Sequence, residues 1–182
     1  MSIWRPQQNI LVKARGLVWR DGLLLASEFY LGDGSIKGVR PLGGRLEFGE
    51  TWRDALVREF DEGLGVAVEV IGKPMVFENI FTHQGVIGHE ITFVSDVIFP
   101  DVAYQQDGPI EYVEDKGETC RAFWFDVEEL DCGHLELYPN GLKAQLPERT
   151  QTSQISGSLD PHSRHRKNSI QSKSLKFRFW HS

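Results

Sequence analysis

The chain has 182 residues, of which 40% are hydrophobic and 25% are charged, and its formal net charge is −6. This composition is typical of a globular protein and excludes wholesale disorder, and no apolar run approaches the roughly 20 residues of a membrane-spanning helix. The N-terminus lacks the apolar stretch and cleavage site of a secretory signal, and the two cysteines, Cys120 and Cys132, suit a reducing compartment. We therefore expect a cytoplasmic protein.

The charge is unevenly distributed along the chain. Residues 147–182 carry seven Lys and Arg against one Glu and one Asp, so the first 146 residues are more acidic than the chain as a whole. We expect residues 1–146 to form one domain, and the basic, Ser- and Gln-rich residues 147–182 to form a flexible extension. An acidic domain repels nucleic acid and anionic membranes, which argues against both as partners. A phosphate-bearing ligand would need a bridging cation.

The first elements along the chain are strands and glycine-rich loops. Residues 10–30 predict two strands, because two runs rich in Val, Leu and Ile flank the turn sequence Arg20-Asp21-Gly22. A glycine-rich loop at residues 31–38 precedes a short extended segment at 39–42. Residues 43–50, GGRLEFGE, then form a second loop with three glycines. A loop without side chains lets backbone N–H groups approach a ligand.

Residues 51–62 predict a helix. Thr51 is a suitable N-cap, and Asp54 follows three positions later as a variant of the capping box. Helical spacing of the apolar residues predicts a buried stripe, and two glycines after the helix supply a stop signal. The stripe consists of Trp52, Ala55, Leu56 and Phe60.

The second half of the chain predicts further strands and a last helix. Apolar runs at residues 66–72, 75–83, 88–99 and 121–125 indicate strands. The acidic residues 100–118 between the last two predict an irregular, mobile loop. Tyr138-Pro139 is expected to begin a helix that continues to Leu146, because proline is tolerated in the first turn of a helix.

Carboxylates gather where the second glycine loop meets the helix. Glu59 and Glu62 lie three positions apart and share a helix face, where like charges weaken the helix unless a positive charge lies between them. Arg58 projects about 100° away around the axis, so we expect that it does not lie between them. Glu47 and Glu50 approach from the loop. A hard cation such as Mg²⁺ would relieve this cluster and let it receive a phosphate; the alternative is a solvated acidic face.

The loop and helix carry no nucleotide-binding motif of the common types. No Gly-Lys-Ser/Thr follows the glycines, which excludes a P-loop, and G-x-G-x-x-G is absent, which excludes a dinucleotide fingerprint. Instead, this segment resembles the box of the Nudix hydrolase family, G-x5-E-x7-R-E-U-x-E-E-x-G-U, with U a bulky apolar residue. The matching pattern is Gly44-x5-Glu50-x7-Arg58-Glu59-Phe60-x-Glu62-Gly63-x-Gly65-Val66. The wider resemblance covers about residues 8–146.

The resemblance implies a fold and a reaction. The expected fold is α+β, an α/β/α sandwich around a mixed sheet. The expected activity is that of a pyrophosphohydrolase, which uses Mg²⁺, with Mn²⁺ as an alternative, to hydrolyse a nucleoside diphosphate linked to another group. The implied partner is therefore a small nucleotide derivative, and a homodimer is compatible with the family.

The resemblance also implies roles for individual residues. Glu59 would be a metal ligand or the base that activates water, and Glu62 would be a metal ligand. A backbone carbonyl near Gly43 or Gly44 would complete the metal site. In supporting roles, Arg58 would pair with Glu50 to hold the loop against the helix, and Glu47 would lie near the metal cluster.

The chain departs from the box at one position, where Gly63 replaces the second of two successive glutamates. That position lies four residues after Glu59 on the same face, so its loss should weaken metal binding. Carboxylates outside the box could replace it, and the candidates are Glu90, Glu111, Glu114 and Glu118. Two other interpretations remain open. One is a catalytically degenerate Nudix-fold module that binds nucleotides or acts as a sensor, and the other is a nucleic-acid-associated protein led by its basic extension.

Overall fold

The computed structural model of the chain describes residues 8–30, 34–83, 85–100, 108–113, 117, 119–133 and 135–146. The expected extension at residues 147–182 lies outside these ranges, as do Glu114 and Glu118. Within the described ranges, no helix is long and apolar enough to cross a membrane.

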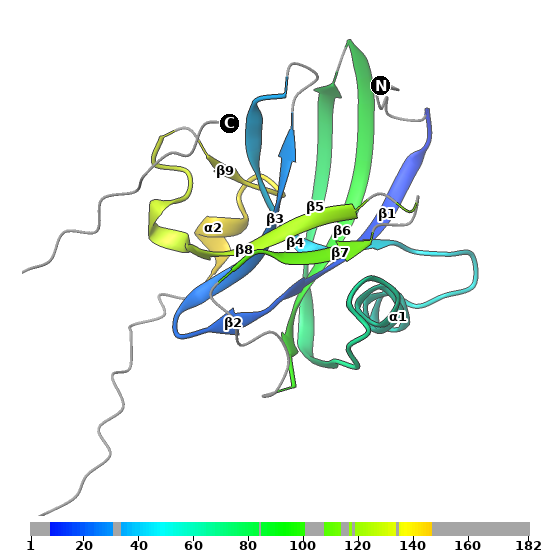
Figure 1. Cartoon of the computed structure of the whole chain (residues 1–182). Helices are drawn as coiled ribbons and strands as arrows, with labels where there is room; N and C mark the ends of the chain where they lie inside the picture. The colour runs from blue at the N-terminus through cyan, green and yellow to red at the C-terminus, as the bar shows by residue number, and fades with distance from the viewer. Residues whose placement is uncertain are drawn as a thin grey trace, which may run out of the picture. The chain divides into compact units, whose positions relative to one another are not determined.

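Nine strands form one mixed sheet in the described part of the chain (Figure 1). Its main path runs β5-β6-β1-β4-β3-β8-β7, while β2 pairs with β3 and β9 pairs with β4. The β1–β6 and β4–β9 pairs are parallel and the others are antiparallel. The strands are β1 Ile10–Leu17, β2 Trp19–Arg20, β3 Leu23–Tyr30, β4 Ile36–Arg45, β5 Glu69–His83, β6 Val86–Ile98, β7 Ile110–Val113, β8 Thr119–Asp126 and β9 Glu136–Leu137.

The main helix, α1 (Trp52–Leu64), begins and ends on residues suited to those positions. The Thr51 hydroxyl accepts a hydrogen bond from the backbone N–H of Asp54, as an N-cap does. Gly65 adopts the left-handed conformation with φ 65°, and its N–H bonds the last turn. The helix runs two residues beyond the predicted 51–62, because Gly63 stays helical and Gly65 alone supplies the left-handed stop.

Apolar residues form two cores, one on each face of the sheet. The stripe of α1, with Ala55, Leu56 and Phe60, packs in the first core against β1, β4 and β7. Leu137 of β9 and Leu142 of the short helix α2 (Leu142–Gln145) pack in the second core, against Val94 of β6. A mixed sheet with one main helix confirms the expected α+β class.

Several boundaries differ from the sequence prediction. The expected irregular loop at residues 100–118 contains β7, a short strand of sequence IEYV that alternates buried and exposed residues and pairs with β8. The extended segment at 39–42 is the centre of the ten-residue strand β4, and the runs at 66–72 and 75–83 merge into β5 with a register shift between Ile71 and Met75. The last helix begins at Leu142 and not near Pro139, because the left-handed Gly141 precedes it.

Candidate active site

The site lies where β4 leads through a short loop into α1. Glu50 in this loop accepts a hydrogen bond from the backbone N–H of Glu47 at 3.0 Å. Arg58 of α1 forms a two-pronged ion pair with Glu50: Nε lies 2.8 Å from Oε1 and Nη2 lies 3.0 Å from Oε2. Nη2 also donates to the carbonyl of Arg45 at 3.0 Å. Arg58 therefore ties the loop and the end of β4 to the helix.

This pairing shifts the pKa values of both partners. The hydrogen bond from Arg58 lowers the pKa of the Glu50 carboxyl, although partial burial acts in the opposite direction. The hydrogen bond to Glu50 is likewise the main reason that the pKa of Arg58 is raised. The hydrogen bond to Glu62 raises this pKa further, while burial acts in the opposite direction. Both groups are charged throughout the neutral range, and the clamp is present there.

The same guanidinium also lies between the two helix carboxylates. Arg58 Nη1 lies 3.0 Å from Glu59 Oε1 and 3.0 Å from Glu62 Oε2. The expectation that Arg58 could not lie between them is wrong. The long side chain bends back along the helix, and positions 58 and 62 form an i,i+4 pair. Arg58 thus offsets the repulsion between the carboxylates of Glu59 and Glu62, from which a bridging cation was predicted.

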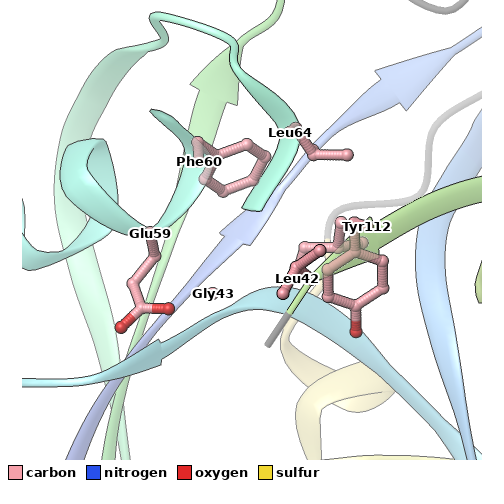
Figure 2. Close-up of a pocket in the computed structure, with 7 residues that line it drawn as sticks. Leu42, Gly43, Glu59, Phe60, Leu64 and Tyr112 are labelled. Carbon is pink, nitrogen blue, oxygen red and sulfur yellow. The ribbon is translucent and has the colours of Figure 1, made fainter. Parts of the chain in front are cut away.

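Glu59 points from α1 onto β4, as Figure 2 shows. A Cβ added to Gly44 would overlap both oxygens of the Glu59 carboxylate, so only glycine leaves room for it. Gly43 has φ 129°, which disfavours a side chain, and a Cβ there would overlap the carbonyl of Ala14. The two glycines therefore let the carboxylate lie directly against the strand.

Glu59 and Glu62 differ in their surroundings. The side chain of Glu59 is only 10% exposed and lines a small pocket, whereas that of Glu62 is 60% exposed. Most of the side chains that line the pocket are apolar, while Glu59 and backbone groups provide its polar surface. Its lining residues are Leu42, Gly43, Glu59, Phe60, Leu64, Tyr112 and Val113 (Figure 2).

The carbonyl of Gly43, one of the two predicted backbone metal ligands, already has a partner. Arg15 on β1, which is only 6% exposed, donates from Nη1 to this oxygen at 2.6 Å and to the carbonyl of Pro41 at 3.3 Å. A cation at the Gly43 oxygen would lie close to the guanidinium. Arg15 was not among the predicted site residues, because its only signal in the sequence was a charged residue inside an apolar strand.

Gly63 faces β7, so a side chain here would meet the end of that strand. A Cβ at this position would lie 3.1 Å from the carbonyl oxygen of Val113 and 3.6 Å from a ring carbon of Tyr112. The first distance is closer than an ordinary van der Waals contact. Where the family box has a glutamate, this chain thus has a glycine that lets β7 pack closely on the helix.

The structure does not bring the other described carboxylates to Glu59. Glu90 on β6 pairs with Lys13 Nζ at 2.6 Å, on the face of the sheet opposite α1. Glu111 alternates with Tyr112, which packs toward α1, so Glu111 lies on the other face. Glu47 is exposed and contributes backbone hydrogen bonds to the loop. Glu114 and Glu118 lie outside the described residues.

The site offers few side-chain oxygens that could bind a Mg²⁺ ion, so waters and substrate phosphates would have to complete the coordination shell of the ion. Among the described residues there is no group of three or more His, Cys, Asp or Glu side chains that could hold a metal ion. Glu59 and Glu62 provide two carboxylates on one helix face. Mg²⁺ is commonly held by one or two carboxylates, with waters and substrate phosphates completing its shell. Glu59 and Glu62 would be the side-chain ligands of such an ion, with waters and substrate phosphates as its remaining ligands.

We compared the chain with known protein families and with curated proteins. The profile of the NUDIX domain family matches residues 11–147. No curated protein matched the chain.

Solved structures also resemble the chain. The E. coli ORF135 protein is 22% identical with a TM-score of 0.44, covering 71% of this chain and 81% of its own. The MutT NUDIX hydrolase of Burkholderia pseudomallei is 21% identical with a TM-score of 0.49, covering 66% of this chain and 86% of its own. A NUDIX hydrolase of Nitrosomonas europaea is 24% identical with a TM-score of 0.40, covering 69% and 75%.

Proposed function

Because the chain belongs to the NUDIX domain family, we propose that it is a Mg²⁺-dependent hydrolase that cleaves the pyrophosphate bond of a nucleoside diphosphate linked to another group. Mn²⁺ is the expected substitute metal. One observation carries the proposal: Glu59, mostly buried and directly above Gly44, presents its carboxylate at a pocket between α1, β4 and β7. A buried carboxylate with a conformation set by its neighbours is suited to act on a reacting group.

Glu59 and Glu62 would hold the metal. When bound, Mg²⁺ supplies positive charge that offsets the charge of the two phosphates. The side chains define the rest of the chemistry. Glu59 accepts the proton of the attacking water, so that the oxygen can form its bond to phosphorus while the bond to the bridging oxygen breaks.

Arg58 has a positioning role in this proposal. It contacts Glu59 and Glu62 through the same nitrogen and Glu50 through the other two, so the loop and both carboxylates depend on one guanidinium. Apolar side chains of Leu42, Phe60 and Leu64 line the pocket beside Glu59, and a substrate that fills this pocket would displace water from the carboxylate. Exclusion of water strengthens the electrostatic interactions of the carboxylate.

A panel of nucleotide diphosphate derivatives, assayed with Mg²⁺, with Mn²⁺ and with EDTA, tests the proposal. We expect metal-dependent hydrolysis of at least one compound, reduced by orders of magnitude in Glu59→Gln with a melting temperature within a few degrees of that of the native chain. Asp61→Asn is the matched control, because Asp61 lies exposed on the same helix. No hydrolysis of any compound, or full activity of Glu59→Gln, would refute the proposal.

A degenerate, nucleotide-binding module is the second candidate. Two observations favour it: Gly63 offers no carboxylate, and Arg58 already provides a positive charge between Glu59 and Glu62. The same panel separates the two functions. A module would bind a nucleotide in calorimetry and leave it intact in the presence of either metal.

A further inference from the structure

An exposed thiol and a lysine amine lie side by side between two short helical segments. Cys132 is one of the two cysteines of the chain, and it is exposed. It follows the 3₁₀ helix η1 (Val127–Glu129), whereas Lys143 belongs to α2. The Nζ atom of Lys143 lies 3.6 Å from the Sγ atom of Cys132, although the two residues are 11 positions apart. Cys132 alone would be an ordinary surface thiol, and Lys143 gives it a reaction partner.

The position of the amine does not depend on its contact with the sulfur. Lys143 Nζ also donates hydrogen bonds to the backbone carbonyls of Leu130, at 2.6 Å, and of Glu128, at 3.0 Å. The thiol of Cys132 donates to the same Glu128 carbonyl at 3.1 Å. The thiol and the amine therefore converge on one oxygen, and the two carbonyls hold the amine beside the sulfur.

Buried leucines fix the two segments that carry the pair. Leu130, which is 1% exposed, lies two positions before Cys132. Leu142, which is 0% exposed, immediately precedes Lys143. Both leucines pack in the second core. Groups that a folded chain holds in contact react far more readily than groups that must meet by diffusion.

We propose that Cys132 and Lys143 form an oxidative modification site, at which hydrogen peroxide causes the two side chains to join through a sulfur–nitrogen bond. In the first step, the sulfur of Cys132 attacks one peroxide oxygen. The S–O bond forms while the O–O bond breaks, so that the peroxide is reduced to water and the thiol is oxidised to a sulfenic acid.

The second step consumes no further oxidant. The neutral amine of Lys143 attacks the sulfur of the sulfenic acid, so that the N–S bond forms and the S–O bond breaks. The departing hydroxide takes a proton from the nitrogen and leaves as water. The product is a sulfenamide, the same linkage that a sulfenic acid forms with a backbone nitrogen.

The linkage competes with irreversible damage to Cys132. A sulfenic acid that stays exposed to peroxide is oxidised further to sulfinic and sulfonic acids, and these products are irreversible. A sulfenamide is reopened by thiols: a first thiol attacks the sulfur and releases the amine, and a second thiol reduces the resulting mixed disulfide. Lys143 thus makes the oxidation of Cys132 reversible.

Mass spectrometry of the full chain after treatment with hydrogen peroxide tests this site. The reaction is run at mildly alkaline pH, where a larger fraction of amines is neutral. We expect a mass lower by two hydrogen atoms, and a linked pair of peptides that contain Cys132 and Lys143 after proteolysis. Dithiothreitol should restore the original mass. Cys120→Ser should give the same product, which excludes an internal disulfide as its source.

Lys143→Arg is the decisive variant, because arginine keeps donors for the two carbonyls while its guanidinium stays protonated and does not attack the sulfur. This variant should form no link and should accumulate several times more sulfinic and sulfonic acid at Cys132 than the native chain. Lys73→Arg, at an exposed position on β5, is the matched control and should behave like the native chain. Thermal unfolding reports on the fold of each variant.

The test needs neither metal nor nucleotide, so its outcome is independent of the proposed hydrolase. Three results would overturn the proposal. The first is a native chain in which Cys132 resists peroxide. The second is a native chain in which Cys132 is oxidised without a link to Lys143. The third is an equal yield of sulfinic and sulfonic acid in the native chain and in folded Lys143→Arg.

Discussion

Substitution of Gly44 by alanine tests whether catalysis depends on the position of the Glu59 carboxylate. The backbone of Gly44 does not have a positive φ, so alanine fits the strand without strain. Its Cβ would overlap both carboxylate oxygens, which must move by about 1 Å or more to reach van der Waals distance. A displacement of about 1 Å can lower catalysis by about 100-fold, and we expect a loss of that order in kcat.

The effect on stability should be at most that of one lost hydrogen bond. The displaced carboxylate loses its 3.0 Å bond to Arg58, and a hydrogen bond between charged groups contributes roughly 1.5–3 kcal/mol. Part of this is recovered, because the side chain is flexible and Arg58 keeps its bonds to Glu50. Chemical unfolding measures the change in the free energy of unfolding.

The assay measures kcat for the best substrate of the nucleotide panel, with Gly133→Ala as the matched control. A Cβ at Gly133 has no atom within 4 Å and its backbone does not have a positive φ, so this variant should behave like the native chain. If folded Gly44→Ala hydrolyses the substrate at the native rate, the position of Glu59 above this glycine has no catalytic importance, and the reasoning is refuted.

Two further predictions concern the helix and the loop. Gly63→Glu and Gly63→Gln should change stability alike, since both side chains press against Val113 and both gain about 0.5–1 kcal/mol of helix propensity. Only Gly63→Glu should tighten Mn²⁺ binding in calorimetry, by about tenfold. Equal Mn²⁺ affinities of the two variants would show that the site needs no ligand at this position. The depressed pKa of Glu50 contributes stability above the ordinary carboxyl pKa of about 4.3, which is lost as the pH falls through the folded-state value. Urea unfolding between about pH 5 and pH 3 should therefore show a smaller loss for Glu50→Gln than for the native chain, and identical losses would contradict the assigned role of the Arg58 pair.

Local features of the chain were predictable because their causes are local. Thr51 and Asp54 cap the helix within one turn, and Gly65 ends it through its own backbone freedom. The spacing of Glu59 and Glu62 placed both on one face, and the box indicated the family, which the match over residues 11–147 confirms. None of these inferences required knowledge of a distant segment.

The tertiary structure decided which groups meet across the sheet. The Arg15–Gly43 bond joins residues 28 positions apart, and the contact of Gly63 with Val113 depends on β7, which the acidic composition had concealed. The pairing of Lys13 with Glu90 likewise requires β1 to lie beside β6. Strand order determines such contacts, and periodicity along a single segment carries no information about which strands become neighbours.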